Sequence, residues 1–180
     1  MNFKINNVEH YTSPSGLNAD EILNAYGTSL VDMKNAMKKK TFVHCHIDKG
    51  FQMDLAEQLE TLLKLLFRSG GSYLYMDGYS PAMRETPDVE VGQKGCAKRI
   101  FIEIEFRPNE HKDIVKFLIG HKKQTLELGI LIVAINREAI NRKYSTMPEY
   151  EKCRKTIEEL QSDCPILVMG IDGNWVPAEG

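Results

Sequence analysis

The sequence predicts a protein of the α/β class, and three stretches of the chain support that prediction. Residues 52–67 place leucines on one helical face, residues 99–106 alternate between apolar and polar side chains, and residues 129–135 form an unbroken apolar run. The first pattern has the period of an α-helix, and the second has that of a strand with one polar face. The third is typical of a strand that is covered on both faces.

Composition places the chain among ordinary globular proteins. Its 180 residues suit one domain with a sizeable core, and the formal net charge of −2 gives no global basic field. DNA contact needs only a basic patch, however. The four cysteines have no CxxC spacing, no signal peptide is recognisable, and no apolar run approaches the roughly 20 residues of a membrane span. We therefore expect reduced thiols in a cytoplasmic protein that does not enter a membrane.

Residues 1–50 are expected to form a helical extension that precedes the core. Turn-forming residues at 13–16 come first, and apolar side chains then recur at near-helical spacing from 20 to 40 despite Gly27. Three lysines at 38–40 suit the negative end of the helix dipole. They are read either as a solvated helix end or as a phosphate-binding patch.

A short strand is predicted for residues 41–47, where His44 and His46 would share one face. Two histidines at this spacing suit a transition metal, but no further Cys or His follows at the spacing of a zinc site. Ordinary surface or partly buried histidines are therefore the favoured interpretation.

A helix over residues 52–67 is the firmest element, and Gly70-Gly71 end it. Glu60 lies at the margin of its leucine face, whereas Glu57 points nearly away from that face. A carboxylate at the margin of a core can reach a site beside the sheet. Solvated surface positions are the alternative for both acids.

A strand over residues 72–76 and a hairpin joining 88–92 to 99–106 follow. In the second hairpin strand, Glu103 and Glu105 share one face because alternate side chains point the same way. The hairpin brings Asp88 close to that pair.

Three carboxylates at one place repel one another unless a cation lies between them. Mg²⁺ is the natural candidate because it is a hard ion that takes oxygen ligands. The alternative is a solvated face of an antiparallel sheet, with the acids in water and the apolar residues in the core.

The second half of the chain predicts a helix over 110–128 with a basic exposed side that includes Lys116, and then the apolar strand at 129–135. A polar loop follows, and the chain closes with a helix over 148–162 and a strand over 165–171.

Pro87-Asp88, a hairpin and Glu103-Ile104-Glu105 resemble the motif of the PD-(D/E)XK nuclease superfamily, with Glu105 where most members carry lysine. The Glu-x-Glu variant, followed by Phe106, a polar turn and a helix leading into GILIVAIN, resembles the BamHI and BglII branch of type II restriction endonucleases. The resemblance covers roughly residues 52 to 136. It implies a mixed central sheet flanked by helices, in the order α-β-β-β-α-β.

The resemblance also implies how the chain is divided. Residues 1–180 would form a single nuclease-like domain, with the extension at 1–50, a catalytic core at 51–136, and a recognition loop followed by the C-terminal helix and strand at 137–180.

The activity implied is metal-dependent hydrolysis of DNA phosphodiesters. Asp88 and Glu103 would hold one Mg²⁺, with the Ile104 carbonyl as a further ligand and Glu60 as an auxiliary acid. Glu105 would bind a second ion or accept a proton from the attacking water. Mn²⁺ would serve as a substitute for Mg²⁺.

The expected partner is DNA. Arginine and asparagine recognise guanine and adenine through paired hydrogen bonds, so the polar loop suits base readout, although ordinary loops have the same composition. The candidate DNA-binding residues are Arg107, Asn136, Arg137, Asn141, Arg142 and Lys143. Cutting both strands of a palindrome calls for a homodimer, and the resemblance puts its contact on the helix at 110–128.

Two other functions fit the same residues. One is a repair or phage-defence nuclease that acts on DNA ends or branches. The other is a catalytically inactive nucleic-acid-binding protein with the same fold.

Overall fold

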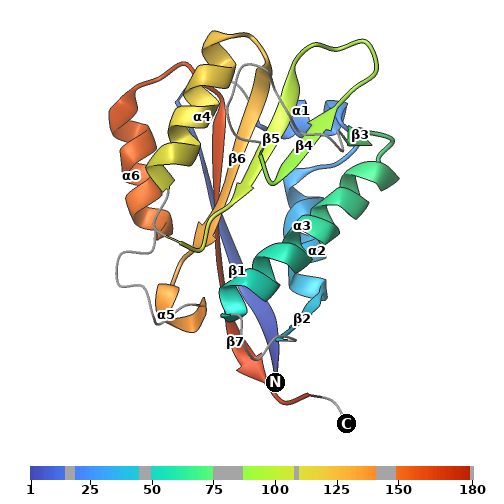
Figure 1. Cartoon of the computed structure of the whole chain (residues 1–180), viewed down its shortest axis with the longest axis vertical. Coiled ribbons are helices and arrows are strands. Elements are labelled where there is room, and N and C mark those ends of the chain that lie inside the picture. The colour runs from blue at the N-terminus through green and yellow to red at the C-terminus, as the bar shows by residue number, and fades with distance from the viewer. Residues whose placement is uncertain (15–18, 45–49, 75–86, 108–109, 141–148, 179–180) are drawn as a thin grey trace.

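The computed structural model describes residues 1–14, 19–44, 50–74, 87–107, 110–140 and 149–178. The described strands are β1 (Asn2–Thr12), β2 (Thr41–Val43), β3 (Tyr73–Leu74), β4 (Val89–Gly92), β5 (Arg99–Ile104), β6 (Leu126–Ala134) and β7 (Ile166–Val176). The described helices are α1 (Ala19–Ala25), α2 (Leu30–Lys39), α3 (Phe51–Ser69), α4 (Glu110–Lys122), α5 (Arg137–Ile140) and α6 (Tyr150–Leu160). The strands join in one seven-stranded sheet with the order β2-β1-β7-β6-β5-β4-β3 (Figure 1).

The sheet is mixed, as the sequence predicts. β5, β6 and β7 run parallel, while β4 pairs antiparallel with β5 and β1 pairs antiparallel with β7. The interior strand β6 is buried along nearly its whole length, which explains its unbroken apolar sequence. The predicted order of helix, three strands, helix and strand is confirmed by α3, β3, β4, β5, α4 and β6.

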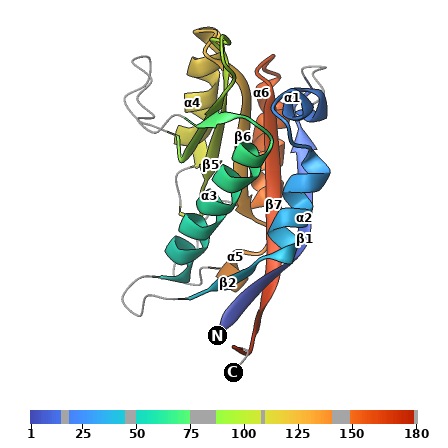
Figure 2. The ribbon, with the colours of Figure 1, turned by 90° about the vertical axis from the view of Figure 1, so that its right-hand side faces the viewer.

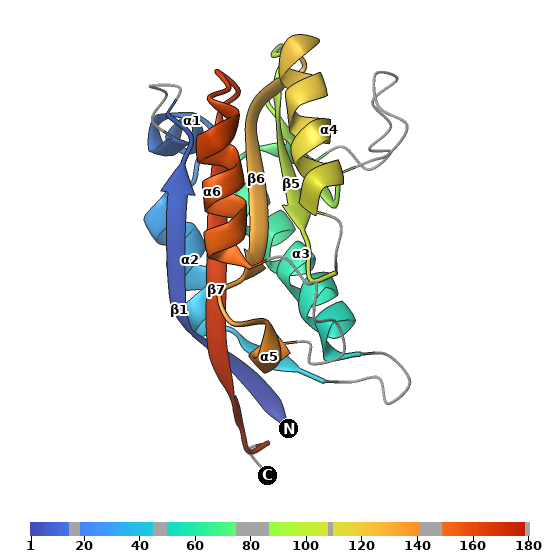
Figure 3. The same cartoon turned by 90° about the vertical axis from the view of Figure 1, so that its left-hand side faces the viewer.

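Helices cover both faces of the sheet. Figure 2 shows α2 and α3 in front of one face, and Figure 3 shows α4 and α6 in front of the other. The alternation of β5 divides its side chains between the two layers, because Ile102 packs in the core shared with α3 whereas Phe101 packs in the core shared with α4. None of the described helices is long and apolar enough to cross a membrane.

The prediction for the N-terminus is wrong in one respect, because residues before position 13 form a long strand. Phe3, Ile5 and Val8 of β1 point into the core, and β1 pairs with β7 along most of its length. The extension at 1–50 therefore contributes an interior strand of the sheet as well as helices. The helix expected over 20–40 is two helices, since Gly27 between α1 and α2 adopts a φ of +78°.

The helix predicted over 110–128 is too long at its C-terminus. α4 ends at Lys122, and Gln124 then adopts a left-handed conformation with a φ of 58°. Leu126 and Leu128, which the helical spacing assigned to α4, pair with β5 as the first part of β6. β7 extends to Val176, five residues beyond the predicted strand end at 171.

Candidate active site

The β4–β5 hairpin places Asp88 across from Glu103. Val89 pairs with Ile102 in an antiparallel register, so that the preceding and following residues lie opposite each other. The Ile104 backbone N–H donates to Asp88 Oδ2 at 2.7 Å, which fixes the carboxylate against the neighbouring strand. The predicted hairpin and the closeness of Asp88 to the Glu-x-Glu strand are therefore confirmed.

Glu105 continues the alternation just past the end of β5. Its backbone N–H donates to the Ile132 carbonyl at 2.9 Å, which keeps the chain attached to β6. Its half-buried carboxylate accepts from the Arg107 backbone N–H at 2.6 Å. Glu105 thus closes a tight local turn at the C-terminal end of β5.

Glu103 is buried and faces α4. Its Oε1 accepts a hydrogen bond from Lys116 Nζ, and Lys116 Nζ also lies 3.5 Å from Asp113 Oδ1. Glu103, Asp113 and Lys116 are 5%, 4% and 8% exposed, so this charge cluster is screened from water on all sides. The prediction that Lys116 belongs to a basic exposed side of the helix is wrong.

Sequence reasoning missed Asp113 and Lys116, although a signal was present. The two residues lie three apart, and on a helical wheel they share a face with Phe117 and Gly120. Phe117 is fully buried against the sheet, which turns the polar pair inward with it.

The pKa values of the acids near the hairpin reflect their burial and the charges of their neighbours. Burial, followed by the charge of Asp113, raises the pKa of Glu103 to about 8, and burial raises that of Glu105 to about 7. Desolvation also raises the pKa of Asp88 and of Asp113, and nearby Glu60 adds to the shift of Asp88. The charged forms of the four acids are therefore disfavoured where they lie, chiefly because burial removes them from water.

The pKa of Lys116 is raised as well, which for a lysine favours the charged form. Burial alone would lower its pKa, but the charges of Glu103 and Asp113 outweigh that effect and raise it. The ammonium group consequently stays a donor, and the Lys116–Glu103 hydrogen bond persists whether or not Glu103 carries a proton.

A cavity of about 170 Å³ opens on the α3 side of the hairpin. Asp88 and Ile104 border it from the strands, and Glu57 and Glu60 border it from α3. The remaining lining residues are Gln52, Met53, Ala56, Phe106 and Arg107. Both candidate acids of α3 thus share a cavity with Asp88, although Glu60 also forms an ion pair with Lys64 on its own helix.

The acids do not gather into a ready-made metal centre. Among the described residues, no three Asp, Glu, His or Cys side chains are close enough to hold an ion together. Asp88, Glu103 and Glu105 each direct one oxygen to a local donor instead. The donor set of carboxylates and a backbone carbonyl is nevertheless the one that Mg²⁺ prefers. The raised pKa values mean that burial disfavours the charged carboxylates, which a bound cation would stabilise.

An orphaned atom adds to this picture. Asp113 Oδ2 is buried and has no hydrogen-bond partner, a costly arrangement unless another group completes it. The residues near the hairpin therefore fit a divalent cation by their chemistry.

The candidate DNA-binding residues fall in different places. Arg107 is exposed at the rim of the cavity. Asn136 lies in the bend before the short helix α5, where its Oδ1 accepts from the Glu138 N–H at 3.0 Å. Arg137 begins α5, where the sequence predicted a loop, and its Nε lies 3.9 Å from Glu149 Oε1. Asn141, Arg142 and Lys143 lie outside the described residues.

The histidine pair is only half described. His44 Nδ1 lies 2.6 Å from Oδ2 of the buried Asp54, next to the ring of Phe51. His46 lies outside the described residues. His44 is thus held by an acid at the start of α3.

A family model for the restriction endonucleases BglII and BglIII matches residues 11–171, nearly the whole chain. The chain belongs to this family. Its core is also similar to the structure titled "Crystal structure of free BglII", with a TM-score of 0.51 and 10% sequence identity over 96% of this chain and 82% of that one. No match is found among curated proteins.

Membership of the BglII/BglIII family settles the class of the protein. It is a type II restriction-endonuclease-like DNA nuclease, and hence a DNA hydrolase, as the resemblance of residues 52–136 implied. The structural likeness at this level of identity shows a common fold. The family typically uses divalent metal ions and acts on DNA.

Proposed function

We propose that this protein hydrolyses DNA phosphodiesters with Mg²⁺, using the acids of the β4–β5 hairpin. The observation that supports this most strongly is the set of carboxylates with raised pKa values around Asp88 and Glu103. Acids with perturbed pKa values beside a cleft are candidates for a functional site, and Asp88 lines such a cavity. Mn²⁺ would replace Mg²⁺ because it accepts the same oxygen ligands.

In this proposal Asp88 and Glu103 are the principal ligands, the Ile104 carbonyl is a further ligand, and Glu60 is an auxiliary one from α3. A bound divalent ion acts as a Lewis acid for the phosphate and favours deprotonation of water. Glu105 accepts the proton of the attacking water, since its pKa of about 7 suits proton transfer near neutral pH. Alternatively, Glu105 holds a second ion.

DNA would approach along the rim that carries Arg107. Its exposed guanidinium borders the same cavity as Asp88, where it can meet a phosphate next to the cleaved bond. Asn136, Arg137, Asn141, Arg142 and Lys143 remain the candidates for base and backbone contacts beyond it. The proposal includes a single domain over 1–180 that acts on DNA in the cytoplasm.

The proposed enzyme is a homodimer, because two symmetric sites are needed to cut both strands of a palindrome. α4 supports this proposal: Val115 and Ile119, one turn apart, are 51% and 40% exposed. Val115→Glu combined with Ile119→Glu is expected to shift the mass in sedimentation equilibrium from dimer to monomer. An unchanged dimer would place the contact elsewhere.

The direct test is incubation of supercoiled plasmid with the purified protein, with and without Mg²⁺. Discrete fragments are expected with Mg²⁺ only, and Asp88→Ala is expected to abolish them. The matched control is Glu159→Ala, which removes an exposed acid from α6.

Other outcomes separate the alternatives. Progressive shortening of linear DNA would indicate a repair or defence nuclease that acts on ends. DNA binding without any cleavage in Mg²⁺ or Mn²⁺ would indicate an inactive binding protein. Metal-dependent cutting that survives Asp88→Ala would mean that other acids form the site.

A further inference from the structure

One buried cation beside the candidate site has no part in the function described so far. Lys116 is the one buried lysine among those that the structure describes. It comes from α4, on the side of the sheet opposite the cavity that Asp88 borders. Its partner across the interface is Glu103, and its partner on its own helix is Asp113.

We propose that Lys116, oriented by Asp113, is a positioning residue that holds the carboxylate of Glu103 in the orientation needed to bind a divalent cation. The inference rests on the proposed function, in which Glu103 is a metal ligand. The ammonium group engages Oε1 of Glu103, so Oε2 is the oxygen left for the ion.

The geometry suits this role better than one in folding alone. A buried ion pair costs a large desolvation penalty, and a well-packed apolar pair of similar volume is often as stable or more so. The apolar core between α4 and the sheet would accept such a pair, because it contains Phe101, Ile114 and Phe117, which lie within two residues of Glu103 or Lys116 in the sequence. A charged cluster at this place therefore calls for a reason other than stability.

In this proposal Asp113 orients Lys116. Its Oδ1 lies 3.5 Å from Lys116 Nζ, while its Oδ2 is buried without a hydrogen-bond partner. One acid thus faces the lysine from its own helix and another faces it from β5. A flexible side chain held between two fixed carboxylates has little freedom to move, so its hydrogen bond fixes Glu103 as well.

Carboxylates that bind metals are usually oriented by a hydrogen-bonding partner behind them, and loss of that partner costs roughly 10- to 100-fold in metal affinity. We therefore expect Lys116→Met to weaken Mn²⁺ binding about 10- to 100-fold. Lys116→Arg keeps a charged donor and is expected to restore part of the loss. Asp113→Asn removes the charge that orients Lys116 and is expected to fall between wild type and Lys116→Met.

The experiment measures Mn²⁺ binding to the whole protein without DNA, by isothermal titration calorimetry and by the electron paramagnetic resonance signal of free Mn²⁺. The matched control is Lys122→Met, which removes an exposed lysine from the same helix. Circular dichroism verifies that each variant is folded. If Lys116→Met fails to fold, Asp113→Asn and Lys116→Arg carry the test.

The outcomes are distinct. Unchanged Mn²⁺ binding in folded Lys116→Met would overturn the inference and leave the proposed function intact. Tighter binding would overturn it too, because it would mean that the ammonium group occupies the position of the ion. A wild-type protein that binds no Mn²⁺, or a Glu103→Gln variant that binds it as well as wild type, would overturn the proposed function and this inference with it.

Discussion

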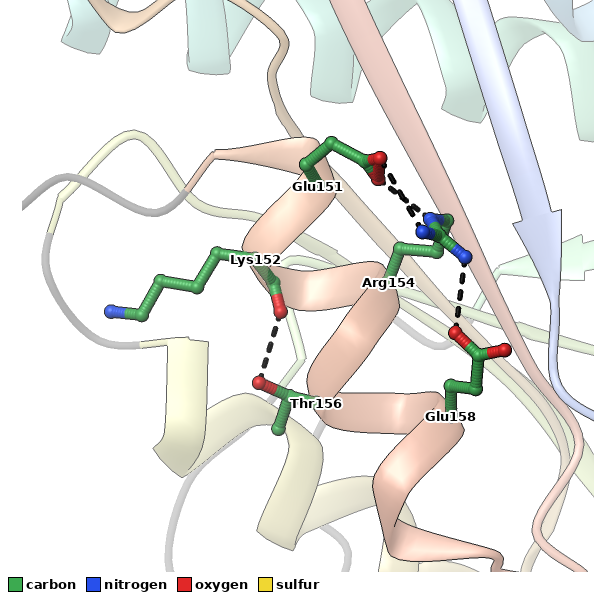
Figure 4. Close-up of polar contacts among 5 residues, drawn as sticks. All are labelled: Glu151, Lys152, Arg154, Thr156 and Glu158. Atoms are coloured by element: carbon green, nitrogen blue, oxygen red, sulfur yellow. Dashed lines mark hydrogen bonds and ion pairs between the residues drawn. The ribbon is translucent and has the colours of Figure 1, made fainter.

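Two groups of opposite charges, one on α6 and one beneath α4, use the same chemistry in different surroundings. On α6, Arg154 bonds to Glu151 at 2.6 Å and to Glu158 at 3.0 Å, all at the surface of one helix (Figure 4). Beneath α4, Lys116 joins Glu103 of the sheet to Asp113 of the helix, and all three are buried.

The pKa values of Glu151 on α6 and of Glu103 beneath α4 shift in opposite directions. The hydrogen bond from Arg154 holds the pKa of Glu151 below its usual range, as expected where water solvates the charges and the partner only adds to their stability. Burial raises the pKa of Glu103 to about 8 even with a lysine attached. The comparison teaches that desolvation, and not the presence of a cationic partner alone, decides the direction in which the pKa of a glutamate shifts.

The largest difference between the two groups is expected in the rate of DNA cleavage. Glu103→Gln keeps the shape of the side chain and removes a proposed metal ligand, so cleavage should fall about 10³-fold, because a bound divalent ion contributes several kcal/mol of transition-state stabilisation and about 1.4 kcal/mol is tenfold in rate. Glu158→Gln on α6 is the control and should leave the rate unchanged. Initial rates of plasmid linearisation in Mg²⁺ measure both, and a Glu103→Gln rate within about tenfold of wild type would contradict the assignment.

The second largest difference between the two groups is expected in the free energy of unfolding. Lys116→Met leaves Glu103 buried without its partner and should lower the free energy of unfolding by about 3–5 kcal/mol. Replacing the whole cluster, as Lys116→Met with Glu103→Leu and Asp113→Leu, should restore most of that loss because none of its buried charges remains. Urea unfolding monitored by tryptophan fluorescence measures this, and a triple variant no more stable than Lys116→Met would show that packing, not charge, is responsible.

A smaller effect is expected from pH on the metal-free protein. The folded-state pKa values of Glu103 and Glu105, about 8 and about 7, exceed their ordinary value of 4.5. Between these limits the folded state binds more protons than the unfolded state, so the contribution of these groups is complete below about pH 4.5 and is lost as the pH rises to about 8.

The melting temperature in EDTA should therefore carry a component that falls between about pH 5 and pH 8, and Glu103→Gln should flatten it. Glu151 provides the contrast, because its lowered pKa gives stability that is present above 4.5 and is lost only on acidification below it. A pH profile that is identical in Glu103→Gln and wild type would contradict the raised pKa of Glu103.

The smallest effect is expected on α6. Arg154→Met removes the centre of the exposed network, and solvent already screens those charges. The cleavage rate should stay within about twofold of wild type, and the urea midpoint should barely move. A large loss of activity would mean that this face of α6 takes part in DNA binding or assembly.

Local patterns in the sequence predict the centre of the fold well. The leucine face of α3, the hairpin around Asp88 and the apolar run of β6 each depend on residues that are neighbours in the chain, so their periodicity identifies them. The Glu-x-Glu alternation also predicts that Glu103 and Glu105 share a face.

Features that depend on contacts between distant parts of the chain could not be predicted from local sequence patterns. β1 becomes an interior strand only by pairing with β7 at the other end of the chain, and its alternation is interrupted between Ile5 and Asn7 by a shift of register. α4 is shorter than predicted because Leu126 and Leu128 belong to β6 and pair with β5 in the sheet. The helical face that Lys116 shares with Phe117 is a local signal of its burial, but its ion pair with Glu103 depends on how α4 docks on the sheet.

The central claim is that a divalent ion binds between the hairpin acids. Crystals soaked in Mn²⁺ and measured at the manganese absorption edge test it most directly. The proposal predicts an anomalous peak in contact with the carboxylates of Asp88 and Glu103 and the carbonyl of Ile104. Active protein whose anomalous peak lies away from Asp88 and Glu103 would contradict it.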